Sequence, residues 1–154
     1  MNELAKKQIQ LDSVDLIAVD GSKSWDRINL LIKIAQHNSK FIRFNCIRIF
    51  TGYEPIENLP KLKNIEFIPI QLSSISHYNK FILTKLHEYV CAEYCLIFQH
   101  DGLIINPQFW DEGFLEYDYI GALFPEAPWN KVNRVGNGGF SLRSKRFIEY
   151  CASL

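Results

Sequence analysis

Short apolar runs alternate with amphipathic segments along most of the chain, and this alternation restricts the possible folds more than any other feature. Val14–Asp20 is a largely apolar run that leads into Asp-Gly, as is typical of a buried strand followed by a turn. Ser24 then precedes a segment, about Trp25–His37, in which Ile28 and Ile32 fall on one helical face. The pattern predicts a buried strand that leads into a helix capped by Ser24.

The same alternation continues to the end of the chain. We expect the first helix to stop at Asn38 in a left-handed conformation, and a second helix, about His77–Tyr89, to be capped by Ser76. A last helix opens at Ser144. Further strands are expected at about Arg43–Phe50, Ile65–Ile70, Tyr94–Gln99, Tyr119–Leu123 and Gly139–Leu142. This order predicts one α/β domain over residues 1–154, with a mostly parallel sheet and helices on both faces.

Composition and charge argue against several classes of partner. Lys plus Arg and Asp plus Glu both number 17, so no global field draws the chain onto nucleic acid or an anionic membrane. We find no signal peptide and no apolar run near the ~20 residues that cross a bilayer. The four cysteines lack the spacing of a disulfide framework and are expected to be reduced. A cytoplasmic protein is expected, with peripheral membrane attachment and homo-oligomerisation left open.

Polar residues follow several of the predicted strands. In parallel sheets, ligands bind beyond the carboxyl ends of the strands, where Asp20, Thr51 and Asp101 are expected to lie. Asp101 follows Gln99 and His100 and precedes Gly102, which allows a sharp turn. A carboxylate in that position can hold a divalent cation such as Mg²⁺, which often takes only one or two protein carboxylates. The alternative is that Asp101 only forms an Asx-turn before Gly102.

Glycines are concentrated near the end of the chain. Gly136, Gly138 and Gly139 surround Asn137, and such a run indicates either positive φ angles or close approach of another group. Asn137 could hydrogen-bond a sugar hydroxyl. The pattern by itself favours a glycine-rich hairpin with Asn137 in the turn.

Aromatic residues cluster just before this glycine run. Most of them are expected in the core, and Trp129, in a loop that contains prolines, is the best candidate for an exposed platform on which a sugar stacks. The cluster comprises Phe109, Trp110, Phe114, Tyr117, Tyr119 and Trp129.

Longer motifs connect these features. Between Tyr78 and Arg143 the chain contains Tyr-Asn-Lys-Phe, then Phe-Gln-His-Asp-Gly, Asn-Pro, Trp-Asp and Phe-Leu-Glu-Tyr-Asp-Tyr-Ile-Gly-Ala, and then Val-Gly-Asn-Gly-Gly-Phe-Ser-Leu-Arg-Ser at Val135–Ser144. This series of motifs resembles an uncharacterised domain family grouped with GT-A-type glycosyltransferases. The resemblance implies a GT-A-like, Rossmann-like fold, with a nucleotide-binding half at about 14–105 and a partial acceptor-side half at about 106–154.

The resemblance also implies roles for individual residues. Asp101 takes the place of the metal-binding acid of the DXD motif, which holds Mn²⁺ or Mg²⁺ against the donor diphosphate, and Gln99 stands where the first acid of that motif would be. The implied nucleotide contacts are Asp20, Gly21, Tyr78 and Asn79. The segment that borders the donor sugar and the acceptor is Asn137, Gly138 and Gly139.

One element of the family pattern is not found. Members carry a Glu-Asp pair, which resembles a catalytic base, some twenty or more residues after the Gly-Gly-Phe-Ser-Leu-Arg-Ser segment, and this chain ends at Leu154. No catalytic residue is therefore assigned, and three alternatives stay open: the domain is truncated at its C-terminus, the base comes from elsewhere, or the protein does not catalyse. The short last helix is expected to leave one sheet face poorly covered.

These observations lead to two hypotheses. The first is a glycosyltransferase that moves a sugar from a nucleotide-diphosphate donor, a UDP-sugar above all, to a glycan or a lipid-linked acceptor. The alternative is a catalytically inactive or truncated remnant that binds nucleotide or carbohydrate without turnover. A signalling receiver domain does not fit, because Ile65–Ile70 lacks the phosphorylatable Asp that such domains carry after the third strand.

Overall fold

Six strands form the main sheet of the computed structural model, which describes residues 8–123 and 135–154. In order across the sheet they are β5 (Glu66–Pro69), β4 (Ile47–Thr51), β2 (Val14–Asp20), β6 (Tyr94–Phe98), β8 (Val135–Ser144) and β7 (Tyr119–Leu123). The first four run parallel to one another, and β8 is antiparallel to both of its neighbours. The prediction of a mostly parallel sheet is confirmed.

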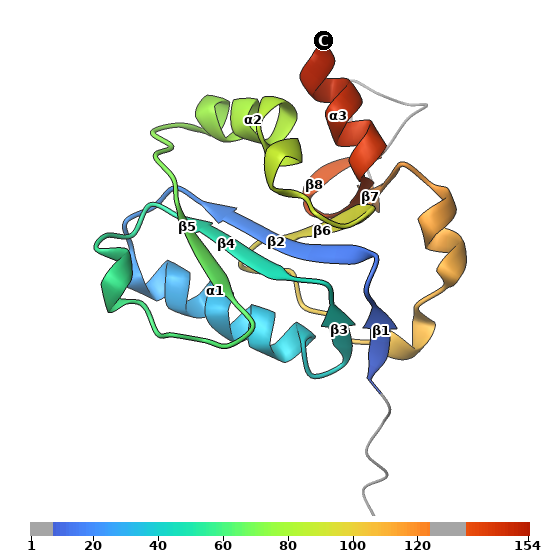
Figure 1. Cartoon of the computed structure of the whole chain (residues 1–154), viewed down its shortest axis with the longest axis horizontal. Coiled ribbons are helices and arrows are strands. Elements are labelled where there is room, and N and C mark those ends of the chain that lie inside the picture. Colours follow the sequence, from blue (N-terminus) through green and yellow to red (C-terminus); the bar gives the residue numbers. More distant parts are fainter. Residues whose placement is uncertain (1–7, 124–134) are drawn as a thin grey trace, which may run out of the picture.

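Helices cover both faces of this sheet, as the alternating pattern predicts. Figure 1 shows α1 (Trp25–Asn38) on one face, and α2 (Ile75–Thr84) and α3 (Lys145–Ser153) on the other. A second, two-stranded parallel sheet joins β1 (Ile9–Leu11) to β3 (Ile42–Phe44). Four 3₁₀ turns complete the described elements: Ile56–Asn58, Leu86–Tyr89, Pro107–Phe109 and Glu112–Glu116.

The central strand β2 separates two hydrophobic cores. All seven of its residues are buried, and because successive side chains point to opposite faces, Leu16 and Ala18 pack on the α1 side. Ile17 and Val19 pack on the other side, in a cluster that includes Ile148 of α3. A fully buried Val, Leu or Ile side chain contributes about 1.5–3 kcal/mol to the stability of the fold, so the two cores hold both helical layers against the sheet.

A buried carboxylate near the start of β2 ties distant segments together. Asp15 is fully buried, and its Oδ2 accepts hydrogen bonds from the backbone N–H groups of Cys91 (2.7 Å) and Ala92 (3.1 Å). Its Oδ1 accepts one from Asn45 Nδ2 (2.7 Å), and Arg48 Nη1 lies 3.6 Å from Oδ2. Because every buried charge needs such partners, Asp15 fixes the segment that leads into β6 against β2 and β4.

Several predicted boundaries are wrong. The single strand expected at Arg43–Phe50 is divided between β3 and β4, because Asn45 turns to Asp15 and Ile42–Phe44 pairs with the unpredicted β1. The cap of α2 is Ser74, whose Oγ accepts from the N–H of His77 (3.2 Å), and not Ser76. The helix itself ends at Thr84 and is followed by the separate 3₁₀ turn at Leu86–Tyr89.

Asn38 and the glycine run also differ from expectation. Asn38 is the last residue of α1, and no described residue other than glycine has a positive φ. Its side chain is fully buried, and it donates to Gly102 O (3.1 Å) and accepts from Ile104 N–H (2.8 Å), which offsets the cost of burying the amide. The glycine run is not a hairpin turn: it belongs to the ten-residue strand β8, and none of the described glycines has a positive φ.

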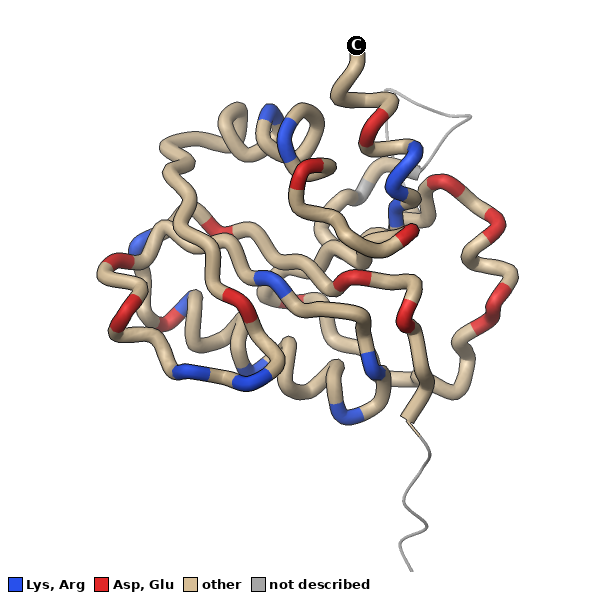
Figure 2. The backbone as a smooth tube through the Cα atoms, viewed as in Figure 1, with Lys and Arg blue, Asp and Glu red and all other residues tan. Residues whose placement is uncertain are grey.

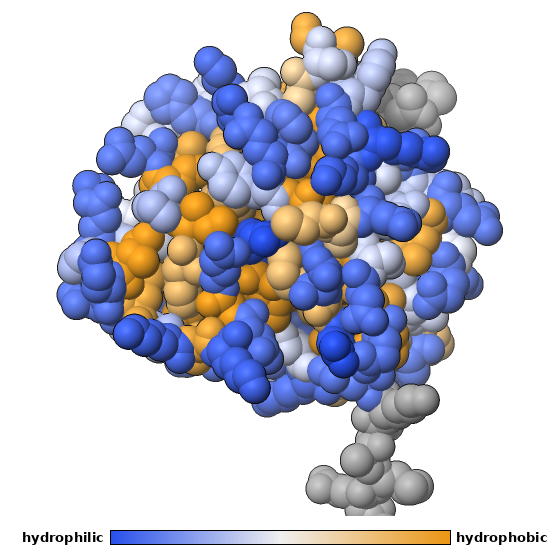
Figure 3. All heavy atoms as spheres, in the orientation of Figure 1, coloured by the Kyte–Doolittle hydropathy of each residue, from blue (hydrophilic) through white to orange (hydrophobic). Residues whose placement is uncertain are grey.

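The surface shows no single dominant charge. Acidic and basic residues are interspersed along the backbone in Figure 2. Figure 3 shows hydrophilic side chains over most of the viewed face, with apolar ones between them in the region of β4 and β5. Within residues 8–123 and 135–154, no helix combines the length and the apolar character needed to span a bilayer.

Candidate functional site

A cleft of about 400 Å³ lies where β2 and β6 end. The chain leaves β2 through α1 toward β4, and it returns from β5 through α2 to β6 on the opposite side of β2. The two helices therefore lie on opposite faces, and the crevice between them at the carboxyl ends of the strands is the usual ligand site of such sheets. Its lining residues are Val19, Gly21, Ser22, Arg27, Leu72, Ser73, Ser74, Ile75, Tyr78 and Gln99.

Asp20, at the end of β2, holds a cation beside this cleft. Its Oδ1 accepts from the Ser22 N–H (2.7 Å) and its Oδ2 from Arg27 Nε (2.7 Å). Burial by itself would raise the pKa of Asp20, but the hydrogen bonds from Ser22 and Arg27 outweigh it and hold that pKa below its ordinary value. Asp20 is thus committed to Arg27, while the half-exposed guanidinium lines the cleft.

The loops beside the cleft approach each other too closely for side chains. A Cβ on Gly21 would lie 2.5 Å from Leu72 Cβ and 2.8 Å from Leu72 O. A Cβ on Gly52 would lie 2.3 Å from Gly21 O. Glycine at position 21 is therefore required for the loop before α2 to close against the end of β2.

The first turn of α2 forms the opposite wall. Ser73 Oγ and His77 Nδ1 are hydrogen-bonded at 2.8 Å, and Ser74 caps the helix. Tyr78 lines the cleft, and its hydroxyl accepts from Gln99 Nε2 (3.4 Å). Tyr78, predicted to contact the nucleotide, and Gln99, predicted to lie at the metal, are thus hydrogen-bonded to each other. Asn79 is exposed and does not line the cleft. The helix N-terminus also presents a partial positive charge, which favours an anion there.

Asp101 lies in the exposed turn directly after β6. The Gly102 N–H donates to Gln99 O (3.0 Å), and a Cβ on Gly102 would lie 2.9 Å from both Phe98 Cβ and Phe140 Cδ2. The turn therefore needs glycine at position 102, and the carboxylate of Asp101 faces solvent. The Leu103 N–H, which an Asx-turn would direct to the Asp101 carboxylate, donates instead to the Asp101 backbone carbonyl (3.1 Å), so an Asx-turn does not shape this segment.

The donor set for a metal is small. Asp101 offers one carboxylate and Gln99 one amide oxygen, which suits a Mg²⁺ or Mn²⁺ ion that shares its other positions with phosphate and water. No group of three His, Cys, Asp or Glu residues in the described parts of the chain could hold an ion by itself. A bound phosphate would have to complete the coordination.

The glycine-bearing end of β8 lies beside the Asp101 turn. β8 pairs with β6 through Ile97 and Ser141, and Phe140 contacts Gly102 as described above. A Cβ on Gly138 would lie 2.7 Å from Arg143 Nη2, so Gly138 makes room for this buried cation. Gly139 is half-buried in the same strand.

Arg143 is held in place by neighbours within the sheet. Its Nε donates to Ser141 Oγ (3.1 Å), and its guanidinium lies 5.2 Å from the centre of the Tyr119 ring. Of the remaining predicted sugar contacts, Asn137 belongs to β8, and Trp129 falls outside the described residues.

Arg27 is a residue of the candidate site that the sequence pattern did not single out. It lies in the first turn of α1, where the helix dipole disfavours a cation. That local conflict is a signal, because a nearby carboxylate can offset it, and Asp20 lies seven residues earlier.

Comparison with known proteins places the chain in a family without assigning an activity. No curated protein and no solved structure matches it. Residues 61–154, well over half of the chain, match a family described as proteins of unknown function, DUF5672. The matched part begins after β4 and includes α2, β6, the Asp101 turn and β8. The chain therefore belongs to the DUF5672 family.

Proposed function

We propose that this protein is a GT-A-like glycosyltransferase that binds a nucleotide-diphosphate sugar in the cleft between β2 and β6. One observation carries the proposal: Arg27, the N-terminus of α2 and the exposed Asp101 turn are gathered at the carboxyl edge of one parallel sheet. A cation and a helix N-terminus attract a diphosphate, and a nearby carboxylate can hold the divalent ion that accompanies it.

Each group has a distinct task in this proposal. Arg27, held by Asp20, donates to the diphosphate, and Ser22 adds a buried hydroxyl that has no hydrogen-bond partner among the described residues. Tyr78 borders the nucleoside, and Asp101 with Gln99 holds Mg²⁺ or Mn²⁺. When bound, the ion offsets the negative charge that grows on the departing diphosphate. The acceptor, a glycan or a lipid-linked sugar, approaches along the glycine-bearing part of β8.

Thermal unfolding tests this assignment. UDP or a UDP-sugar with Mn²⁺ should raise Tm, because a ligand at a hundred times its Kd stabilises the native state by about 2.7 kcal/mol. The Asp101→Ala variant should lose most of the Mn²⁺-dependent part, and Arg27→Gln should lose the response to UDP itself. Arg43→Gln is the matched control, because Arg43 is an exposed cation outside the cleft. A Tm that does not respond to any nucleotide diphosphate would refute the proposal.

A second candidate function is binding without turnover. It is favoured by Gln99, which leaves Asp101 as the single carboxylate of the motif and gives the ion less negative charge to bind. Hydrolysis of the UDP-sugar, assayed by release of UDP, distinguishes the two functions. Stabilisation by UDP without any release would assign the protein to the binding class.

A further inference from the structure

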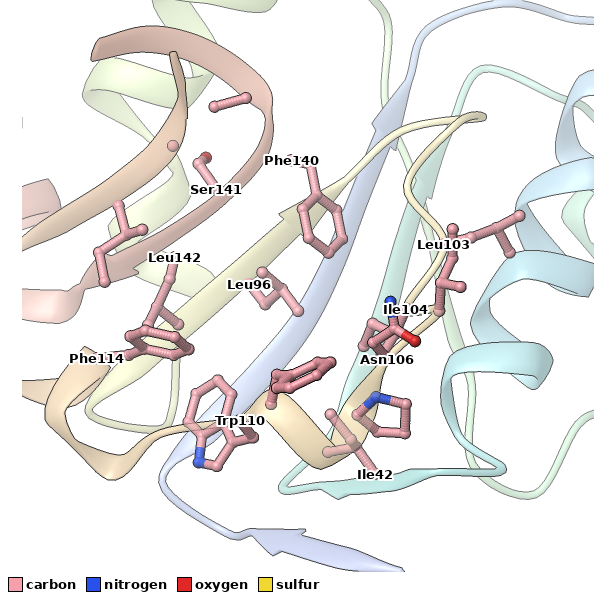
Figure 4. A pocket seen from close by; sticks show the side chains of 16 residues that line it. Ile42, Leu96, Leu103, Ile104, Asn106, Trp110, Phe114, Phe140, Ser141 and Leu142 are labelled. Atoms are coloured by element: carbon pink, nitrogen blue, oxygen red, sulfur yellow. The ribbon is translucent and has the colours of Figure 1, made fainter.

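A second, apolar pocket of about 530 Å³ lies on the α1 side of the sheet. Its floor is formed by Leu96, Ile120 and Leu142, which stand side by side on β6, β7 and β8. Trp110 lies in the segment that borders the pocket (Figure 4), and Phe109 of the same segment also lines it. The sixteen lining residues include no charged side chain. Its volume falls in the range of small-molecule sites.

The walls of this pocket are fixed by hydrogen bonds and ring contacts. The buried Asn38 side chain holds the bordering segment at both Gly102 O and Ile104 N–H. Farther along, Trp110 Nε1 donates to Glu112 Oε1 (3.0 Å), and the rings of Trp110 and Phe114 meet edge to face at 5.4 Å. A site held in this way needs little ordering when a ligand enters.

One end of the pocket lies next to the turn that carries Asp101. Phe140 lines the pocket and contacts Gly102, the residue that follows Asp101. In Figure 4, Phe140 stands near this end, and Trp110 and Phe114 lie at the other. A molecule seated in the pocket can therefore place one end beside the turn that carries Asp101.

We infer that this pocket holds the hydrocarbon part of an amphiphilic ligand whose sugar or hydroxyl head lies at the Asp101 turn. A free sugar or a nucleotide does not suit the lining, because its hydroxyls and charges would lose their hydrogen bonds to water. A hydrocarbon chain suits it, and Phe109, 73% exposed, gains a partner at the rim. The role of this ligand as the acceptor rests on the proposed function, and the binding itself does not.

Titration calorimetry with decyl maltoside, kept below its micelle concentration, tests this inference, with maltose as the headgroup-only control. Saturable binding of decyl maltoside without binding of maltose is expected. Phe109→Ser should weaken binding by about tenfold or more, because one aromatic wall is lost. Tyr117→Ser is the matched control, since Tyr117 is also an exposed aromatic of the same region but does not line the pocket.

Each result decides the question. Ala122→Trp, at an exposed residue of the lining, should fill the pocket and abolish binding while leaving Tm unchanged. The inference is overturned if decyl maltoside does not bind, if Phe109→Ser and Tyr117→Ser bind it equally, or if the pocket variants instead dissociate a dimer in sedimentation. Binding of decyl maltoside without any Tm response to nucleotides would support the inferred pocket ligand and refute the proposed transferase. A Tm response to nucleotides without binding of decyl maltoside would support the transferase and refute the pocket ligand.

Discussion

Asp20 shows how one carboxylate can act through another residue. The sequence led us to expect a direct nucleotide contact, but both of its oxygens are occupied, by the Ser22 N–H and by Arg27. Asp20 therefore affects a ligand by holding the Arg27 guanidinium in place, and not by direct contact. Asp20 is a positioning residue in the proposed site.

The lowered pKa of Asp20 makes a pH-dependent prediction. A carboxyl whose pKa is lower in the folded than in the unfolded state stabilises the fold at neutral pH, and that stability is lost as the pH falls through the native pKa. Asp20→Asn should therefore be less stable than the wild type at pH 7 and should lose less stability between about pH 5 and pH 2. Urea unfolding across this range measures both effects.

The exposed Asp12 provides the control for this experiment. Asp12→Asn removes a carboxylate that is 72% exposed and lies 3.8 Å from Arg43, and an exposed ion pair of this kind contributes little to stability. A stability profile for Asp20→Asn that runs parallel to that of the wild type would show that Asp20 contributes no such linkage.

At the scale of single residues, sequence identified part of the site. Asp20, Gly21, Tyr78 and Gln99 do gather at one cleft or beside it, because strand ends of a parallel sheet share an edge. Arg27 was missed, since its importance depends on a hydrogen bond that only the folded chain makes.

At the scale of elements, the local sequence pattern predicts where helices and strands occur more accurately than it predicts the residues at which they begin and end. α2 illustrates why: Ser74 and Ser76 both have a hydroxyl that can cap, and only the backbone geometry decides between them. β3 and β1 are three residues long, and their pairing joins parts of the chain that lie more than thirty residues apart. No local period reveals such a pair.

The two serines allow a matched test at this scale. Ser74→Ala should destabilise the protein by about 1 kcal/mol, because the His77 N–H loses its acceptor. Ser76→Ala should change stability by less than about 0.5 kcal/mol, because it replaces an exposed residue inside the helix. Urea unfolding of both variants measures the difference, and equal losses would show that Ser74 is not the effective cap.

At the scale of the whole molecule, packing determines which aromatic residues lie in the core, and composition does not. The aromatic cluster was expected mostly in the core, yet Phe109 and Tyr117 are largely exposed, and Trp110 only partly buries its ring against the α1-side core. Aromatic side chains suit cores and ligand sites equally well, so only their placement around the apolar pocket separates the two uses.

The two edges of the sheet should open before its centre. Every residue of β2 is buried, and the strand has neighbours on both sides. β7 has one neighbour, an irregular register near Gly121–Leu123 and two exposed residues at its end. Hydrogen exchange should therefore be slowest in β2 and β6, through global unfolding, and much faster at Ala122–Leu123, through local opening. Equal protection of β7 and β2 would contradict this order of stability.

The strand order also decides where the chain can be cut. Residues 61–154, which match the family, supply β5, β6, β7 and β8, whereas β4 and β2 lie between β5 and β6 and come from earlier residues. A recombinant fragment limited to the matched residues would separate β5 from the other strands and expose one side of β6. The boundaries of the family match are therefore not those of a cooperative folding unit, and expression of this protein should begin before β2.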